Sequence, residues 1–259
     1  MIRRVLIGLL CAVCTAASGA DAQDAAGLTA VKAVLFPRRE AMIAARIDGT
    51  VLRHHFLVGQ RFKAGDMITQ IDDAHYRLMA ARSEAQKLEA STLAAIAAEA
   101  YAAQKKLYEE NMQSKVELDR REAELATARA RQKITQAEYS EAILQLGYCR
   151  ISAPFDGRVE EILVREHETV RAGQPVVRVI GDRELLAVVN LPVALLSKMH
   201  GALAFRFPEG PDGLEVSGKV FEISPRADHR SGTIEVKVLI DNSSGKLTSG
   251  MTGVFLDGK

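Results

Sequence analysis

IDGTV at residues 47–51 returns as FDGRV at residues 155–159, and this repetition decides the fold. Aligned with itself at an offset of 108 residues (156 minus 48), the chain matches residues 48–71 to residues 156–179 without a gap. Glycine-rich turns and valine-rich strands resemble one another by chance. Two turns in register with apolar positions between them nevertheless indicate one structural unit used twice. The identical positions are Asp48/Asp156, Gly49/Gly157, Val51/Val159, Ala64/Ala172 and Gly65/Gly173.

The glycines of the two stretches are turn signals. Gly49 and Gly157 follow an aspartate, and Gly65 and Gly173 follow an alanine, so both halves carry the same two signals in the same order. Glycine relieves the steric penalty of a positive φ angle. We therefore predict that Gly49 and Gly157 occupy equivalent turns with positive φ, and that Gly65 and Gly173 are structural turn residues too.

Residues 74–146 differ in composition from the rest of the chain: they contain neither Pro nor Gly and are rich in strong helix formers such as Ala, Glu, Lys and Leu. The stretch 111–114 interrupts this pattern. Ser114, with Glu117 three residues later, is a capping-box signature for a new helix. We predict two antiparallel helices of roughly 35 residues each, reaching about 50 Å. The alternatives are a dimerising coiled coil or a single long helix, and the cap in mid-segment argues against the single helix.

The spacing of apolar residues in this segment predicts where the two helices meet. Apolar residues that recur at steps of three and four lie on one face of a helix, and alanines allow two helices to approach closely. We expect the first helix to use Leu93, Ile96, Ala100, Ala103 and Leu107 for this contact, and the second to use Ala123, Ala126, Ala130, Ala137 and Leu144.

The helical segment starts where the first half of the repeat ends and finishes where the second begins. Each half supplies only a few short strands and cannot bury a core alone. We predict that residues 48–72 and 150–181 pack face to face as one sandwich, split by a helical hairpin at 73–149. Residues 23–47 are expected to form strands that join the β-domains. Residues 182–259, with short apolar runs and frequent turns, predict a small antiparallel barrel or sandwich. The fold class is therefore mainly β with a long α-helical hairpin.

Composition narrows the function. The chain has 259 residues, a net charge of +1 and 26% charged residues, so no strong overall field attracts nucleic acid. It contains no Trp, and its aromatic content of 5% argues against a large aromatic-lined pocket.

Residues 1–22 have the features of a targeting segment. Arg3 and Arg4 precede the apolar run VLIGLLCAVCTAA, and Ala20-Asp21-Ala22 matches a cleavage site. The run is shorter than the about 20 residues that a membrane span needs. We predict an exported protein whose signal peptide is cleaved after Ala22. An uncleaved anchor is the alternative.

The sequence offers little chemistry. Cys11 and Cys14 lie in the targeting segment without a lipidation pattern, so Cys149 is the only cysteine of the expected mature chain and no internal disulfide can form. No nucleophile motif, phosphate loop or C-x-x-C pair occurs, and we predict no enzymatic activity and no cofactor. The histidines and the methionines Met42, Met67 and Met79 lack close spacing, so we predict no metal site.

At this point the residues resemble a known family. The paired halves, DGTV with KAG at 63–65 and DGRV with RAG at 171–173, look like the two halves of a biotinyl/lipoyl domain. Here the hairpin replaces the tight turn that bears the modified lysine in carrier domains. RISAPFDGRV at 150–159, with SGTIEVKV and LTSGMTGVFL further on, resembles HlyD-type periplasmic adaptor subunits, also called membrane fusion proteins. The resemblance covers roughly residues 30–259 and implies a split lipoyl-like sandwich, a coiled-coil hairpin and a β-barrel.

The resemblance implies a tripartite pump for the efflux of small molecules. The adaptor would lie in the periplasm, associated with the inner membrane. It would link an inner-membrane transporter of RND or ABC type to a TolC-type outer-membrane channel and would self-associate into a ring. The family's hairpin tip carries an Arg, Leu, Ser, Asp pattern that meets the channel. Leu107, Ser114 and Asp119 match it, while Ala103 stands at the arginine position. The three matching residues also have an ordinary structural interpretation: a leucine of the helix contact, an N-cap serine and a first-turn acid.

The sequence departs from the family pattern at two places. His167 stands at the position equivalent to Gly59, so we expect the turn there to differ. The chain stops at Lys259, so we expect the usual membrane-proximal domain to be truncated or absent. An acyl or biotin carrier is opposed by the missing turn lysine. A periplasmic coiled-coil scaffold unrelated to transport remains the main alternative.

Overall fold

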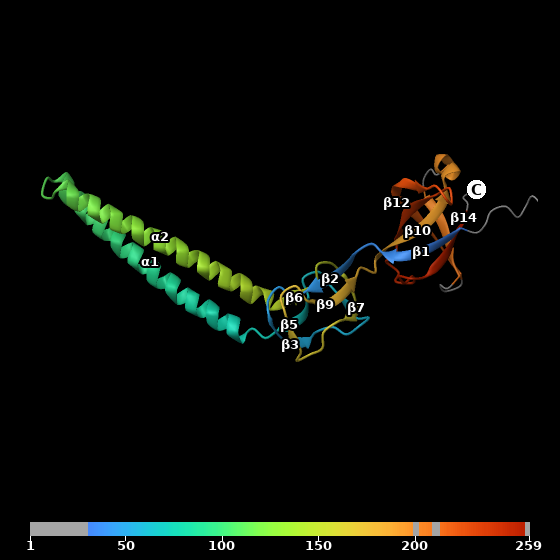
Figure 1. The fold of residues 1–259 in the computed structure, drawn as a ribbon, viewed down its shortest axis with the longest axis horizontal. Coiled ribbons are helices and arrows are strands. Elements are labelled where there is room, and N and C mark those ends of the chain that lie inside the picture. The colour runs from blue at the N-terminus through green and yellow to red at the C-terminus, as the bar shows by residue number, and fades with distance from the viewer. Residues whose placement is uncertain (1–30, 199–201, 209–212, 257–259) are drawn as a thin grey trace, which may run out of the picture.

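The computed structural model describes residues 31–198, 202–208 and 213–256. Three parts follow one another along the long axis of the molecule: a helical hairpin, a domain of two β-sheets and a β-barrel (Figure 1). The described part of the chain begins in the barrel, passes through the sheets to the hairpin tip and returns to the barrel. The predicted targeting segment at residues 1–22 lies outside the described residues.

The predicted pair of antiparallel helices is confirmed. Helix α1 spans Ala74–Glu109 and helix α2 spans Lys115–Tyr148, with 36 and 34 residues. The break falls at residues 110–114, as the interruption in the sequence predicted. Gly147 does not end the second helix, which continues for one more residue and brings Tyr148 against the core of the sheets.

The predicted contact residues between the helices are wrong. The buried residues of α1 are Ala80, Ala90 and Ala94, whereas Leu93 and Ile96 are 54% and 58% exposed. The stripe that faces α2 is displaced from the predicted one by a single residue. Both stripes repeat at steps of three and four, and the structure uses the one with the smaller side chains because alanine lets the helix axes approach closely. The buried residues of α2 are Leu125, Thr135 and Ala142.

Each of the two sheets at the base of the hairpin has four strands. The order in one sheet is β2 (Glu40–Ala44), β9 (Pro175–Ile180), β7 (Gly157–Ile162) and β4 (Arg61–Phe62). The order in the other is β6 (Arg150–Ser152), β5 (Met67–Ile71), β3 (Gly49–His54) and β8 (Thr169–Val170). The offset of 108 residues relates the two sheets strand by strand, in the same order. The sequence repeat is therefore a structural repeat.

The two halves of the repeat are interleaved, which differs from the expected face-to-face packing of one half on the other. With β2 counted in the first half, as the equivalent of β6 in the second, each sheet takes two strands from each half. In each sheet, two central strands of one half are flanked on both sides by single strands of the other, so each half pairs the backbone edges that the other would leave open.

The repeated aspartates tie the halves together reciprocally. The Asp48 carboxylate of the first half accepts a hydrogen bond from the Ala172 backbone nitrogen of the second, at 2.8 Å. The Asp156 carboxylate of the second half accepts one from the Ala64 nitrogen of the first, also at 2.8 Å. Each Asp-Gly sequence thus satisfies the Ala-Gly turn of the opposite half, which is why the chain contains both pairs twice.

The glycines serve two different purposes. Gly65 and Gly173 have φ of +87°, the left-handed conformation that glycine adopts without penalty. The prediction of positive φ at Gly49 and Gly157 is wrong, because these residues begin strands β3 and β7 and have no positive φ. Glycine is needed there for close approach instead, since a Cβ at either position would overlap a neighbouring strand.

The turn at His167 also differs from the expectation. His167 has φ of +67° and Gly59 has φ of +84°, so the histidine adopts the conformation of the glycine it replaces. The hydrogen bond is the same in both halves: the Gly59 nitrogen donates to the Val159 oxygen at 2.8 Å, and the His167 nitrogen donates to the Val51 oxygen at 2.7 Å. This shared hydrogen bond holds the histidine in a conformation that non-glycine residues disfavour.

The hairpin is anchored in the core of the sheets. Tyr76 of α1 and Leu146 and Tyr148 of α2 pack on a buried cluster that includes Val51 and Cys149. The Tyr76 hydroxyl also donates a hydrogen bond to the Asp48 backbone oxygen at 2.8 Å. The first turn of α1 and the last turn of α2 are therefore part of the sheet domain.

The C-terminal region is a closed barrel, which decides between the predicted barrel and sandwich. Its short helix η1 spans Val193–Lys198. The barrel core is built around the fully buried rings of Phe205 and Phe207. The barrel order is β1 (Lys32–Pro37), β10 (Glu184–Pro192), β13 (Thr233–Asp241), β12 (Leu214–Asp228), β11 (Ala202–Phe207) and β14 (Thr252–Leu256), which pairs again with β1.

Candidate functional site

The hairpin tip, at the end of the molecule farthest from the barrel, is a compact turn (Figure 1). The Asn111 nitrogen donates to the Tyr108 oxygen and the Met112 nitrogen donates to the Leu107 oxygen, both at 2.9 Å. Asn111 has φ of +58°. These two bonds and the left-handed residue form a Schellman motif, which satisfies the last carbonyl groups of α1. The tip is thus held in one conformation by its backbone.

Ser114 begins the second helix as predicted. Its hydroxyl accepts a hydrogen bond from the Glu117 nitrogen at 3.4 Å. The Glu117 carboxylate, which a full capping box would direct back to Ser114, instead bonds the Arg120 guanidinium at 2.5 Å. That bond from Arg120 lowers the pKa of Glu117. An acid in the first turn also suits the positive end of the helix dipole.

The structure brings two of the three predicted tip residues to the turn itself. Leu107 is two residues before the end of α1, Ser114 caps α2, and Asp119 lies exposed about one helical turn further along α2. Leu107 is 37% exposed and is not among the buried residues of α1, so it lies outside the buried core of the helix contact. The N-cap interpretation of Ser114 is confirmed.

Sequence reasoning missed an apolar surface at the tip. Met112 and Val116 are 68% and 79% exposed. Tyr108, four residues before Met112, is also partly exposed. The signal was present, because large apolar residues stand next to turn residues in an otherwise polar stretch. Solvent-exposed apolar groups gathered at one end of a long hairpin are suited to contact another protein.

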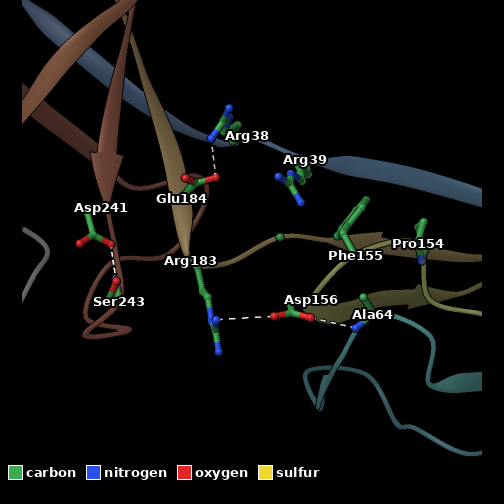
Figure 2. Close-up of a pocket in the computed structure, with 11 residues that line it drawn as sticks. Arg38, Arg39, Ala64, Pro154, Phe155, Asp156, Arg183, Glu184, Asp241 and Ser243 are labelled. Carbon is green, nitrogen blue, oxygen red and sulfur yellow. Dashed lines mark hydrogen bonds and ion pairs between the residues drawn. The ribbon is translucent and has the colours of Figure 1, made fainter.

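A cleft of about 480 Å³ lies between the sheet domain and the barrel (Figure 2). Arg38 pairs with Glu184 at 2.6 Å, and Arg183 pairs with Asp156 across the cleft at 3.5 Å. The Asp241 carboxylate bonds Ser243. Positive and negative groups balance in this cleft, so it does not select strongly for one sign of charge. Its charged lining residues are Arg38, Arg39, Arg183, Asp156, Glu184 and Asp241.

Cys149 and His55, which lie outside these regions, have shifted pKa values, and burial is the main cause for both. Burial raises the pKa of the Cys149 thiol to about 11, so the thiol is protonated at neutral pH. Burial, with the neighbouring Arg53 and His54 charges, lowers the pKa of His55. Within the described parts of the chain, no group of three or more His, Cys, Asp or Glu side chains could hold a metal ion.

Across residues 31–198, 202–208 and 213–256, no helix combines the length and the apolar character that crossing a bilayer requires. The exposed faces of the hairpin carry charged pairs such as Arg121–Glu124 at 3.0 Å and Arg77–Asp73 at 2.6 Å.

Two family models match the chain. The model described as "RND MFP, barrel-sandwich hybrid domain" matches residues 39–181, more than half of the 259 residues. This range contains both halves of the repeat and the hairpin between them. The model described as "CusB-like, beta-barrel domain" matches residues 197–255, which lie in the barrel.

Curated proteins and solved structures are similar as well. Multidrug resistance protein MdtA of Klebsiella pneumoniae is 28% identical over 209 residues, covering 77% of this chain and 51% of that protein. MdtA of Escherichia coli K12 is 27% identical over 214 residues, covering 79% and 52%. The chain thus spans about half the length of these relatives.

Among solved structures, a membrane fusion protein from Streptococcus pneumoniae R6 has a TM-score of 0.66 at 17% identity, covering 88% of this chain and 98% of that one. A MacA-MexA chimera containing the Pseudomonas aeruginosa MexA α-hairpin domain has a TM-score of 0.62 at 20% identity, covering 88% and 78%. At these identities the similarity concerns the fold.

Proposed function

Because this chain belongs to the RND-type membrane fusion protein family, we propose that it is a periplasmic adaptor linking an inner-membrane transporter to a TolC-type outer-membrane channel. The observation that carries the proposal is the family match over residues 39–181, which includes the hairpin and its tip. The curated relatives named for multidrug resistance support efflux of small molecules as the process. We expect the chain to position other proteins and to catalyse no reaction.

The shape of the molecule supports a linking role. The barrel and the hairpin tip lie at opposite ends, so one chain can contact two partners at once (Figure 1). A helix of 36 residues is about 54 Å long, a length that serves to bridge distance. In this proposal the barrel end contacts the transporter and the tip contacts the channel.

The finer assignments belong to the same proposal. We propose that the interleaved sheets are a lipoyl-like domain without a carrier function, because a hairpin of two long helices stands where the modified lysine would be. Kinship with HlyD-type adaptors, a transporter of RND or ABC type, and assembly of several copies into a ring around the channel are proposed on the same basis. Periplasmic location and signal cleavage after Ala22 would be tested by N-terminal sequencing of the exported protein.

We propose that Leu107, Ser114 and Asp119 contact the channel. The two fixed backbone caps of the tip support this role, because they present the exposed apolar groups of Leu107 and Met112 in a single arrangement. A preorganised surface binds with less loss of conformational entropy than a mobile one.

The docking experiment must separate loss of contact from loss of the helix cap. Ser114→Asp keeps an N-capping oxygen and adds charge at the tip, so it is preferable to substitutions that remove the cap. We expect Leu107→Asp combined with Ser114→Asp to leave folding intact, and to abolish both cross-linking to the channel and export. Leu88→Asp is the matched control, because Leu88 is an exposed leucine on the shaft of the same helix.

The main alternative is a periplasmic coiled-coil scaffold that takes no part in transport. Undiminished cross-linking and export in the double variant would show that this tip does not dock the channel. If in addition neither a transporter nor a channel can be cross-linked to any position of the wild-type chain, the scaffold function is supported and the adaptor function is wrong.

A further inference from the structure

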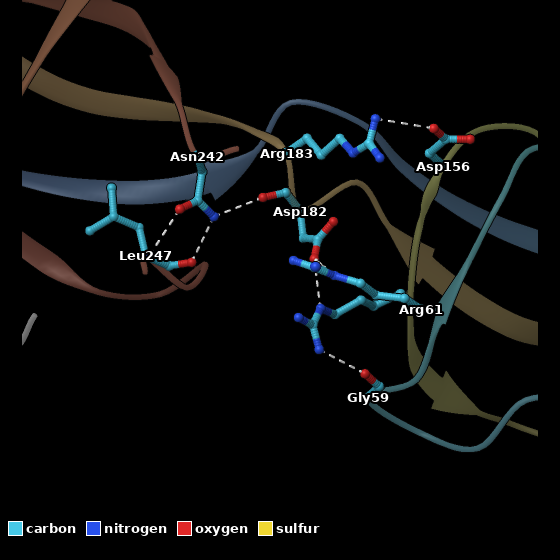
Figure 3. A network of polar contacts seen from close by, with 8 residues as sticks. Gly59, Arg61, Asp156, Asp182, Arg183, Asn242 and Leu247 are labelled. Carbon is cyan, nitrogen blue, oxygen red and sulfur yellow. Dashed lines mark hydrogen bonds and ion pairs between the residues drawn. The ribbon is translucent and has the colours of Figure 1, made fainter. Parts of the chain in front are cut away.

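We infer that Asp182 is a joint residue that holds the barrel and the hairpin-bearing sheet domain at one angle, with its backbone bound to the barrel and its carboxylate bound to the sheets (Figure 3). The inference concerns the chain alone and goes beyond the proposed adaptor function. It holds or fails whichever partners the protein has.

Only two short segments connect the barrel with the sheet domain. Residues 38–39 run between β1 and β2, and residues 181–183 run between β9 and β10. Among the described residues, none of the three buried clusters contains side chains from both domains. Apolar packing therefore does not determine the angle between the domains, and polar contacts at the connecting segments must do so.

The barrel holds the backbone of the connecting segment through Asn242. The Asn242 side chain donates to the Asp182 backbone oxygen at 2.8 Å, and its backbone nitrogen donates to the Arg183 oxygen at 2.7 Å. Asn242 is 2% exposed and exchanges two further hydrogen bonds with the Leu247 backbone, at 2.8 and 2.9 Å. Because this amide is buried and fully bonded, the segment is fixed to the barrel.

The sheet domain holds the side chain of the same residue. The Asp182 carboxylate accepts from Arg158 Nε of β7 at 2.6 Å and from Arg61 Nε of β4 at 2.9 Å. Arg158 is itself fixed by a hydrogen bond to the Gly59 backbone oxygen at 3.0 Å. Both guanidinium groups converge on one oxygen that is largely shielded from water, since the Asp182 side chain is only 17% exposed.

Electrostatics favour the charged form of this contact. Burial alone would disfavour an ionised carboxylate, but the hydrogen bonds from Arg158 and Arg61 outweigh it and hold the pKa of Asp182 below its usual value. The other pair across the cleft, Arg183 with Asp156, is longer at 3.5 Å and its arginine is 71% exposed. Exposed pairs contribute little, so Asp182, whose carboxylate is better shielded, is the stronger of these two side-chain links. The connecting segments also bond through their backbones, from the Gly181 nitrogen to the Arg39 oxygen at 2.8 Å and from the Arg38 nitrogen to the Glu184 oxygen at 3.1 Å.

The position of the joint amplifies small changes. The hairpin extends from the side of the sheet domain opposite the barrel (Figure 1). The helices are about 54 Å long, so a rotation of about 10° at the joint displaces the tip by roughly 9 Å more than it displaces the base of the hairpin. The angle at Asp182 therefore determines where the tip lies for a given position of the barrel.

The test measures the angle directly in the isolated full chain. Spin labels are placed at Lys133→Cys on α2 and Lys219→Cys on β12, both exposed, in a chain with Cys11→Ser and Cys14→Ser. Cys149 is retained because it is buried. Pulsed electron spin resonance then gives the distribution of distances between hairpin and barrel. We expect a single narrow distribution that becomes at least twice as wide in Asp182→Asn.

Controls separate the joint from general damage. Asp241→Asn removes a carboxylate that lines the same cleft but bonds Ser243 in the adjoining barrel loop. This variant should leave the distance distribution unchanged. Arg61→Gln should give an intermediate width, because one of two guanidinium groups remains. If Asp182→Asn fails to fold, as judged by circular dichroism, the Arg61→Gln and Arg158→Gln double variant replaces it. A distribution as narrow as wild type in a folded Asp182→Asn, or in that double variant, would overturn the inference.

Discussion

Gly157 lies so close to Ile180 that a Cβ added to the glycine would overlap the backbone carbonyl of the isoleucine. At the equivalent position, a Cβ on Gly49 would be 2.5 Å from the Ile71 Cγ2 methyl group. A side-chain methyl can move more easily than a strand backbone. The two glycines of the repeat therefore tolerate substitution unequally, although the sequence presents them as the same.

We predict that Gly157→Ala lowers the free energy of unfolding by about 1–3 kcal/mol, and Gly49→Ala by less. Gly147→Ala serves as the control, because nothing lies within 4 Å of its added Cβ and alanine favours a helix; it should raise stability by about 0.5–1 kcal/mol. Urea unfolding of the three variants provides the measurement. Equal losses at Gly49 and Gly157 would contradict the explanation by backbone overlap.

His167→Gly is expected to stabilise the protein. His167 has φ of +67° in a turn where the other half of the repeat has Gly59, and relieving the left-handed penalty should gain about 1 kcal/mol. The reciprocal change, Gly59→Ala, should lose a similar amount, since Gly59 has φ of +84°. Thermal unfolding compares both variants with wild type. A destabilised His167→Gly would show that the imidazole makes a contribution larger than the backbone strain.

The joint at Asp182 should respond to acid in a defined range. The folded-state pKa of this carboxyl is lowered, so its contribution is fully present above the unfolded value of about 3.9 and is lost as the pH falls through the folded value. We expect the hairpin-to-barrel distance distribution to stay constant from pH 8 down to the unfolded value of about 3.9, and to widen only at lower pH, as the carboxyl is protonated in the folded protein. Because other carboxyl groups also titrate there, the comparison is with Asp182→Asn, which should already be wide at pH 7. Widening at pH 6 in the wild type would contradict this assignment.

The Cys149 thiol should be nearly inert in the folded protein. It is buried and its pKa is raised to about 11 by burial, so the reactive thiolate is scarce at pH 7 to 8. In a chain with Cys11→Ser and Cys14→Ser, iodoacetamide labelling followed by mass spectrometry should show modification only after unfolding in guanidinium. Rapid labelling under native conditions would mean that this part of the core opens readily.

Removal of the hairpin shaft should leave the sheets folded, provided that its base is kept. Replacing residues 80–142 by a short turn retains Tyr76, Leu146 and Tyr148, which pack on the sheet core. Circular dichroism should show that helix is lost and strand is kept. Replacing residues 74–146 removes Tyr76 and Leu146, so that variant should be less stable. Loss of strand signal in the shorter deletion would show that the β-domain depends on the whole hairpin.

The sequence predicted the architecture well where local chemistry decides it. Ser114 and the interruption before it placed the helix boundary, because a capping side chain acts on the backbone of its own turn. The repeat predicted paired β-segments around the hairpin for a similar reason, since turn residues and apolar alternation are local signals. The role of a residue is easiest to predict from the sequence when that residue meets a requirement of the backbone next to it.

The sequence was misleading where distant parts of the chain select between equivalent patterns. On α1, Leu93 and Ile96 are three residues apart and Ala90 and Ala94 are four apart; both steps fit one face of a helix, and only the approach of α2 chooses the smaller residues. Gly157 could not be distinguished from a turn glycine because its requirement comes from Ile180 on another strand. The Asp182 contacts likewise join residues 24 and 121 positions apart, which no local pattern reveals.

The reciprocal bonds between Asp48 and Ala172 and between Asp156 and Ala64 have a consequence for the order of folding. Neither half can complete its turns until the other is present, and the partners are 124 and 92 residues apart. Such non-local pairing makes a β-domain slow to form, because the entropy of loop closure is lost before the stabilising contacts can form. Above its base, the hairpin consists of two helices that pack on each other, so it can form first. Once formed, it brings Ile71 and Cys149, whose backbones bond at 2.8 Å, to the same place. A formed hairpin thus holds the end of β5 and the start of β6 together, so the two halves of the repeat pair as if a much shorter loop joined them.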